Sequence, residues 1–255
     1  MRVIVTRPAA QAADWVRQLQ AQAIDAVALP LIGIAPVADA TELIAAWHAL
    51  AQRRLVVFVS PNAAEQFFAT RPATATWPPA TLAGSPGPGT TRVLDTLGVP
   101  AAQIVEPAAD AAQFDSESLW QQLAPRDWRG AKVLIVRGDS GRDWLADTLR
   151  THGAEVDHVA GYRRCAPSFD AAQRTLLQDA LAAPERHLWF FSSSEAIDNL
   201  AACTQGVAGV DWSRSAAVAT HPRIAARAGQ LGFARVTEAR PALAAVVACI
   251  QSIRP

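Results

Sequence analysis

The stretch KVLIVRGDSGRDWLADTLRTHGAEVDHVAGYRRCAP, residues 132–167, decides the fold that we expect for this chain. Its apolar run VLIV at 133–136 is typical of a strand that is covered on both faces. Gly138 and Gly141 predict a turn, which a helical pattern follows. A second extended run begins at 156–159. Strand, turn, helix and strand in this order form the repeating unit of a parallel α/β sheet.

The N-terminal part of the chain repeats this unit, because a short apolar strand at residues 3–5 is followed by Arg7 and by a helical pattern. Arg137 follows Arg7 by 130 residues (137 minus 7). Further pairs recur at similar offsets: Trp15 and Trp144 (129), Pro36 and Pro167 (131), Ser60 and Ser192 (132), Pro88 and Pro222 (134), and Gly98 and Gly232 (134). We therefore predict an internal duplication and two similar lobes.

Length and composition exclude several classes of protein. With 255 residues, 23 basic and 23 acidic side chains, the chain has room for two modest domains but no charge excess for nucleic acid or an anionic membrane. Cys165, Cys203 and Cys249 lack CxxC spacing and indicate free thiols in a reducing compartment. No apolar run reaches the roughly 18 residues of a membrane span. The first residues lead into a strand and not a signal peptide, so we expect a cytoplasmic protein.

Strand and helix patterns alternate along the whole chain, which predicts parallel sheets with helices on both faces. The helical patterns that we identify cover residues 9–22, 41–52, 62–69, 90–97, 116–123, 169–181, 194–203, 222–231 and 241–253. In such sheets ligands bind beyond the carboxyl ends of the strands, beside the N-termini of the helices that follow. The candidate functional residues are therefore those directly after each strand.

These strand–helix loops contain small hydroxyl side chains, glycines and two arginines. Free N–H groups and the helix dipole bind anions at helix N-termini, and arginine can clamp a carboxylate or a phosphate. We therefore predict an anion site made by Arg7, Ser60, Asn62, Gly89, Thr90, Arg137, Gly138, Ser193, Ser194 and Thr220. The chain has no metal-ligand set, GxSxG elbow, Walker A motif or GxGxxG in its first turn, so we expect no metal and no cofactor.

Each of these residue types also has a structural interpretation. Ser and Thr at helix starts commonly cap the helix, and either arginine could be a surface charge. For His221 a structural role is favoured, and the paired tryptophans Trp15 and Trp144 are typical of core packing. Tyr162, the single tyrosine of the chain, has an apolar counterpart at Leu31 (162 minus 131). Packing and function remain open for this phenol.

Several ordered motifs together resemble the uroporphyrinogen-III synthase family over nearly the full length. They are VTRP at 5–8, LPLI at 29–32, FVSPNA at 58–63, GPGT at 87–90, FDSESL at 114–119, VLIVRGDSGRDWL at 133–145, GYRR at 161–164 and FFSSSEA at 190–196. The resemblance implies two α/β lobes, each a parallel sheet flanked by helices, joined by a two-stranded connector. Residues 1–30 plus 168–255 would form one lobe, 37–160 the other, and 31–36 with 161–167 the connector.

The resemblance also implies an activity, a lyase reaction of haem biosynthesis that needs no metal or organic cofactor. The family closes the linear tetrapyrrole hydroxymethylbilane to uroporphyrinogen III, with inversion of the D ring and loss of water. Its connector tyrosine matches Tyr162, which would assist departure of the hydroxyl group. Its loop hydroxyls match Ser60, Thr90 and Ser194, as binders of the substrate carboxylates. The chain departs from the family at residues 221–224, where HPRI replaces the common Gly-Pro-Thr-Thr.

The implied partner is the small-molecule substrate, and a transient contact with the upstream hydroxymethylbilane synthase stays open. We expect a monomer that binds neither nucleic acid nor membrane. The competing hypothesis is a two-lobed cytoplasmic protein that binds a small anionic ligand without chemistry.

Overall fold

The computed structural model describes residues 1–139 and 141–253, and the chain divides into two compact units. Unit 1 combines Met1–Gly33 with Cys165–Pro255, and unit 2 is Ile34–Arg164. The chain thus passes between the units twice. Residue 140, in the turn that Gly138 and Gly141 predict, lies outside the described residues.

Unit 2 contains a six-stranded sheet in the order β3-β8-β7-β4-β5-β6, and its pairs from β8 to β6 are parallel. The strands are β3 (Gly33–Pro36), β4 (Leu55–Phe58), β5 (Leu82–Gly84), β6 (Ile104–Val105), β7 (Lys132–Gly138) and β8 (Glu155–Cys165). The helices are α2 (Thr41–His48), α3 (Pro61–Ala69), α4 (Pro88–Thr96), α5 (Ser116–Leu123) and α6 (Trp144–Thr151). Short 3-10 turns span Leu50–Gln52 and Ala101–Gln103.

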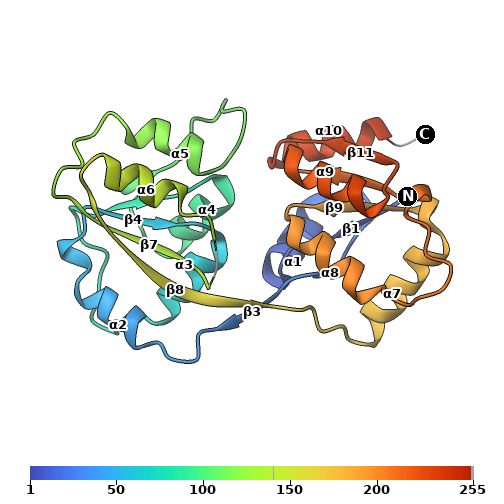
Figure 1. Ribbon diagram of the computed structural model, residues 1–255, viewed down its shortest axis with the longest axis horizontal. Coiled ribbons are helices and arrows are strands. Elements are labelled where there is room, and N and C mark those ends of the chain that lie inside the picture. The colour runs from blue at the N-terminus through green and yellow to red at the C-terminus, as the bar shows by residue number, and fades with distance from the viewer. Residues whose placement is uncertain (140, 254–255) are drawn as a thin grey trace. The chain divides into compact units, whose positions relative to one another are not determined.

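Alternate side chains of β7 pack into two different cores of this unit. Val133 and Ile135 pack with buried residues of α5 and α6, whereas Leu134 and Val136 pack with those of α2, α3 and α4. Figure 1 shows these two groups of helices on opposite sides of the sheet. The prediction that residues 133–136 form a strand covered on both faces is confirmed.

Unit 1 contains a five-stranded sheet in the order β11-β10-β9-β1-β2, in which every pair is parallel. The strands are β1 (Arg2–Val5), β2 (Ala26–Ala28), β9 (His187–Phe191), β10 (Ala216–Ala219) and β11 (Arg235–Glu238). The helices are α1 (Ala9–Gln20), α7 (Ala171–Ala182), α8 (Ser194–Cys203), α9 (Pro222–Leu231) and α10 (Leu243–Ile253), with 3-10 turns at Pro184–Arg186 and Trp212–Arg214.

One face of this sheet packs against α1 and α10, through buried residues that include Val3, Leu19 and Ile250. Phe191 of β9 points to the opposite face, where its ring meets that of Phe233 edge-on. The α/β class and the two similar units, each a parallel sheet flanked by helices, agree with the sequence prediction.

Helix starts show how closely the two halves correspond. Both α4 and α9 begin at a proline, Pro88 and Pro222, which preserves the predicted offset of 134. The N-caps of α3 and α8 are Ser60 and Ser193, which are 133 residues apart (193 minus 60). The structural counterpart of Ser60 is therefore Ser193 and not Ser192, one residue from the predicted match.

One sequence prediction is wrong in detail. Trp144 is 39% exposed on α6, so it does not pack in the core as its counterpart Trp15 suggested, and Leu145 and Leu149 fill the core beside it. The extended run that begins at residues 156–159 continues to Cys165, because Glu155–Cys165 is one continuous strand. This strand, β8, pairs with β7 as far as Tyr162.

Candidate functional site

Tyr162 lies at an irregularity in the pairing of β7 with β8. Arg137 pairs with Ala160 but Gly138 pairs with Tyr162, so β8 carries one extra residue, Gly161, at this point. Such a bulge re-aims the side chain that follows it. A Cβ on Gly138 would lie 3.1 Å from Cε2 of Tyr162, so glycine leaves the space that the phenol ring occupies.

The Tyr162 ring is fully buried in the core of unit 2, and its hydroxyl has a polar partner. Tyr162 Oη lies 3.1 Å from Oγ of Ser60, a part-buried residue directly after β4. Ser60 Oγ also accepts the backbone N–H of Ala63 at 3.2 Å, which caps α3. The structure therefore brings together two predicted site residues, one of them exposed enough to meet a ligand.

The other predicted residues at the carboxyl ends of the unit 2 strands differ in how far they are exposed. Gly89, in the first turn of α4, is exposed, and a Cβ placed on it would meet only Pro61 Cγ at 3.9 Å. Asn62 and Thr90 are 7% and 3% exposed, which leaves little of either side chain for a ligand. The N-terminus of α4 receives no side-chain cap bond, and the N–H groups of Thr90 and Thr91 donate to the Gly87 carbonyl. The backbone N–H of Gly89 is therefore the better candidate for anion binding.

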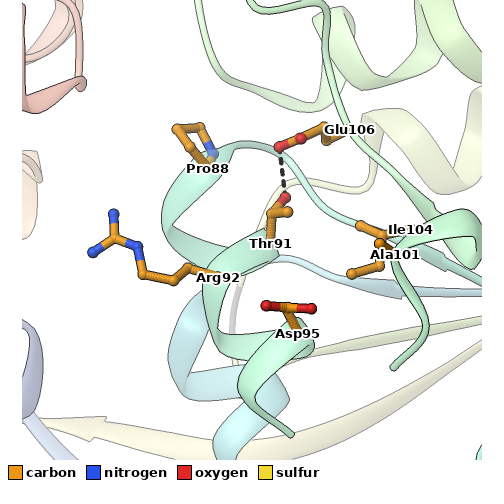
Figure 2. A pocket seen from close by; sticks show the side chains of 7 residues that line it. All are labelled: Pro88, Thr91, Arg92, Asp95, Ala101, Ile104 and Glu106. Atoms are coloured by element: carbon orange, nitrogen blue, oxygen red, sulfur yellow. Dashed lines mark hydrogen bonds between the residues drawn. The ribbon is translucent and has the colours of Figure 1, made fainter. Parts of the chain in front are cut away.

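A pocket of about 350 Å³ lies beside the same helix, lined by Pro88, Thr91, Arg92, Asp95, Ala101, Ile104 and Glu106 (Figure 2). Thr91 Oγ1 donates to Glu106 Oε2 at 2.6 Å, and it lies 2.9 Å from Ser85 Oγ. The lining carries an arginine and two acidic side chains. This mixture of charges does not favour a ligand with many carboxylates.

Arg137, at the end of β7, has an internal counter-ion. Its Nη1 donates to Asp143 Oδ1 at 2.6 Å, and this hydrogen bond holds the pKa of Asp143 below its usual range. Nε2 of His158 on β8 lies 3.7 Å from the same carboxylate oxygen. Burial and the charge of Arg137 lower the pKa of His158, so the imidazole beside this ion pair favours its neutral form.

In unit 1, the carboxyl ends of β1, β9 and β10 come together as the sequence predicts. The backbone N–H of Thr6 donates to the carbonyl of Phe190, and that of Thr220 to the carbonyl of Phe191. The Thr6 side chain is also committed, because its Oγ1 donates to the Phe190 carbonyl at 2.8 Å. Thr220 is 7% exposed, so its backbone and position matter more than its hydroxyl.

Arg7 follows β1 in unit 1 and has no carboxylate partner among the described residues. Its guanidinium carbon lies 5.0 Å from the centre of the Trp15 ring and 5.8 Å from that of Phe190. Nη1 makes a long hydrogen bond of 3.4 Å to Gln11, and the buried Nε finds no hydrogen-bond partner within residues 1–139 and 141–253. Burial lowers the pKa of Arg7 to about 10.

Serines and a histidine occupy the remaining helix starts of unit 1. Ser193 and Ser194 begin α8, both are part-buried, and Ser193 makes no side-chain cap bond, so its hydroxyl is available to a ligand. His221 caps α9, because its Nδ1 accepts the N–H of Arg223 at 3.1 Å. This supports the structural interpretation of His221. Ile224 is buried, so it does not replace a loop hydroxyl.

Sequence reasoning missed the partners of both arginines. Asp143, in the turn before α6, pairs with Arg137, and His158 on β8 approaches Asp143; no motif marks either residue. Trp15 was identified, but as core packing alone.

Among the described residues, no group of three His, Cys, Asp or Glu side chains is arranged to hold a metal ion. None of the described helices is both long and apolar enough to span a membrane.

Comparison with known proteins places these features in a family. A family model described as "Uroporphyrinogen-III synthase HemD" matches residues 13–248. The uroporphyrinogen-III synthase of Synechococcus elongatus is 28% identical over 218 residues, 83% of this chain and 77% of that protein. The synthase of Chlorobaculum parvum is 28% identical over 203 residues, 77% and 76% of the two chains. That of Salmonella typhimurium is 39% identical over 61 residues, only 24% of this chain and 25% of that protein.

Solved structures show the same fold. The uroporphyrinogen-III synthetase of Helicobacter pylori aligns over 100% of both chains with a TM-score of 0.57 and 16% identity. A mutant uroporphyrinogen III synthase of Thermus thermophilus aligns over 99% of this chain and 98% of its own, with a TM-score of 0.56 and 15% identity. With the family model matching most of its length, the chain belongs to the uroporphyrinogen-III synthase family.

Proposed function

We propose that this chain cyclises hydroxymethylbilane to uroporphyrinogen III, with inversion of the D ring and loss of water, and so acts as a lyase in haem biosynthesis. Family membership and the relatives' names indicate uroporphyrinogen-III synthase activity on a small-molecule substrate. The alternative of a two-lobed binding protein without chemistry is not favoured. The family match gives it no support.

The observation that carries the proposal is the set of donors at the carboxyl ends of both sheets. Hydroxymethylbilane carries eight carboxylates, which require N–H groups, hydroxyls and guanidinium groups. Arg7 is the best placed of these donors, because no carboxylate within residues 1–139 and 141–253 neutralises its charge. A carboxylate that approached Arg7 would supply the missing counter-ion and would form a charge-assisted hydrogen bond.

The remaining substrate contacts that we propose come from both units. In unit 2 they are Ser60, Asn62, Gly89, Thr90, Arg137 and Gly138, and in unit 1 they are Ser193, Ser194 and Thr220. Both Asn62 and Thr90 have buried side chains. For Asn62 the contact is through its backbone N–H group, whereas the N–H of Thr90 donates to the Gly87 carbonyl, so Thr90 contributes through the small part of its side chain that is exposed. Gly138 acts indirectly, by leaving room for the Tyr162 ring. Tyr162 assists departure of the hydroxyl group from the substrate.

Further proposals concern organisation and context. Residues 1–30 with 168–255 and residues 37–160 form the lobes, and residues 31–36 with 161–167 are the connector that acts as the hinge if the lobes move. The free thiols of Cys165, Cys203 and Cys249 support a reducing compartment such as the cytoplasm. We also propose a monomer, in transient contact with the upstream hydroxymethylbilane synthase.

Product analysis tests the activity. Hydroxymethylbilane is generated in situ with and without the protein, and the cyclic products are oxidised and separated by isomer. Spontaneous closure gives the type I isomer, so heat-denatured protein is the matched control. We expect type III with the folded protein. Type I alone from folded protein would remove the synthase proposal.

A further inference from the structure

The placement of the Ser60 and Tyr162 hydroxyls raises a question about which of them meets the substrate. The phenol belongs to a core cluster with Phe58, Phe67 and Val136, and the side chain is 0% exposed. Ser60 lies between this core and the surface, directly after β4, and its neighbour Val59 is 37% exposed. A ligand at the carboxyl edge of the sheet can therefore touch Ser60 while the phenol stays covered.

Either hydroxyl could donate in the 3.1 Å hydrogen bond that joins them. The direction follows from which proton would otherwise lack an acceptor. Ser60 is the only hydrogen-bond partner of the phenol among the described residues. If Ser60 donated, the phenol proton would be left without an acceptor in an apolar core, which is unfavourable. Tyr162 as the donor avoids this cost, so Tyr162 donates and Ser60 accepts.

Ser60 Oγ then accepts two hydrogen bonds, one from Tyr162 and one from the N–H of Ala63. A hydroxyl has two acceptor lone pairs and one proton. Both lone pairs are used, so the Ser60 proton is free to point to a third partner outside the core. Two donors on one oxygen also polarise that hydroxyl and make its proton a better hydrogen-bond donor.

We propose that the Ser60 hydroxyl touches the substrate and gives it a proton. Tyr162 acts through Ser60 as a positioning residue, and its phenol replaces the proton that Ser60 gives up. This inference rests on the proposed synthase reaction. The C–O bond of the hydroxymethyl group breaks with its electron pair on oxygen, which takes the Ser60 proton and leaves as water. The pyrrole nitrogen supplies an electron pair to the carbon and forms the azafulvene cation, while the Tyr162 proton moves to Ser60.

The charges and protons of this step balance. The phenolate left on Tyr162 is compensated by the azafulvene cation formed in the same step. Ring closure later replaces a C–H bond of a pyrrole by a C–C bond and releases one proton, which restores Tyr162 through Ser60. No oxidant, metal or further reactant is required.

The described part of unit 1 has no such pair of hydroxyls, which separates this arrangement from ordinary helix capping. The position equivalent to Tyr162 is Leu31, which is fully buried and apolar. Ser193, the N-cap that corresponds to Ser60, makes no side-chain cap bond. The cap, the phenol and the bulge at Gly161 therefore occur together in unit 2.

A double-mutant cycle tests the relay. Ser60→Gly removes the hydroxyl but keeps a residue that is tolerated at the N-cap, and Ser60→Thr retains both hydroxyl and cap. We expect Ser60→Gly and Tyr162→Phe each to lower kcat about tenfold to a hundredfold with little change in KM. The double variant should fall no further than the worse single variant, and Ser60→Thr should restore most of the rate. Multiplicative effects, or full activity of Ser60→Gly, would overturn the relay.

A second measurement does not depend on turnover. Since the chain has one tyrosine, protein made with ¹³Cζ-labelled tyrosine gives a single resonance that responds to the hydrogen bond of the phenol. We expect this resonance to move in Ser60→Gly and to stay near its wild-type position in Ser60→Thr. An unmoved resonance in Ser60→Gly would overturn the relay even if the wild-type protein makes the type III isomer. Absence of type III from the wild type would instead remove the synthase proposal.

Discussion

Arg7 in unit 1 and Arg137 in unit 2 occupy equivalent positions of the internal repeat, yet their surroundings differ. Arg137 is paired with Asp143 at 2.6 Å, whereas Arg7 has aromatic rings beside it and, among the described residues, no carboxylate partner. A partly buried cation without a counter-ion is unfavourable for the free protein and is retained where a ligand supplies the opposite charge. The comparison teaches that duplication preserved the position of the arginine but not its charge balance.

The hydroxyl side chains also differ between the two units, but here it is unit 2 that has the special arrangement. Unit 2 has the Ser60–Tyr162 pair, whereas unit 1 has Ser193 without a cap bond and the apolar Leu31. The free cation thus lies in one unit and the linked hydroxyls in the other. On this account unit 1 mainly binds carboxylates, and unit 2 assists bond cleavage.

The largest expected effect compares Arg7→Gln with Arg137→Gln in the isomer assay. We expect Arg7→Gln to lower kcat/KM by roughly 30-fold or more, since loss of a desolvated charged contact typically costs about 2–5 kcal/mol. Arg137→Gln should cost less than about tenfold, because Asp143 already neutralises this arginine and the contact is more exposed. Equal losses from the two variants would show that the arginines remained equivalent.

The next effect concerns the space that unit 2 provides for its phenol. Gly138→Ala places a methyl group 3.1 Å from the Tyr162 ring, and we expect a loss of about 1–3 kcal/mol in the free energy of unfolding. Gly89→Ala is the control, because its Cβ would make only an ordinary contact, 3.9 Å from Pro61 Cγ, and a helical alanine is favoured by about 0.4–1 kcal/mol. Urea unfolding of both variants checks the difference, and a neutral Gly138→Ala would mean that the ring does not fill this space.

Much of this arrangement could be predicted from the sequence, because it depends on residues that are close together in the chain. The apolar run at 133–136 must be buried on both faces, and the prolines at 88 and 222 set the helix starts. These features alone place the candidate residues at the carboxyl edges. The ion pair of Arg137 and its neighbour His158 could not be predicted, because Asp143 reaches Arg137, and His158 reaches Asp143, only when β7, β8 and the turn before α6 are folded.

Tyr162 and Trp144 show where the pattern fails. The resemblance identified the tyrosine, but its burial depends on a single extra residue in β8, which no periodicity reveals. Trp144 shares the helical face of Leu145 and Leu149 but lies at the first residue of α6, where the helix start leaves it 39% exposed. A repeat therefore predicts positions better than it predicts surroundings.

A smaller effect follows from removing the counter-ion of Arg137. Asp143→Asn should raise the apparent affinity for substrate, lowering KM by about two- to fivefold, because the guanidinium charge becomes available to a carboxylate. Asp147→Asn is the matched control, since Asp147 pairs with Arg150 and not with Arg137. Steady-state kinetics check both variants, and a higher KM in Asp143→Asn would mean that Asp143 positions Arg137 for the substrate.

The smallest effect concerns pH. The pKa of His158 in the folded protein lies below its ordinary value of 6.5, mainly because of burial and then because of Arg137. The unfolded chain therefore binds the proton more readily, so stability is lost as the pH falls below 6.5. We expect His158→Gln to make unfolding less dependent on pH in this window. Parallel pH profiles of the unfolding midpoint for wild type and variant would contradict this.

The most direct test of the contrast between the two arginines is thermal unfolding of Arg7→Met and Arg137→Met without ligand. Replacing a partly buried charge that lacks a counter-ion by an uncharged side chain of similar length should stabilise the protein, and we expect Arg7→Met to raise Tm by about 2–4 °C. Arg137→Met should leave Tm unchanged or lower it, because Asp143 loses its partner. A fall in Tm of similar size in both variants would contradict the account.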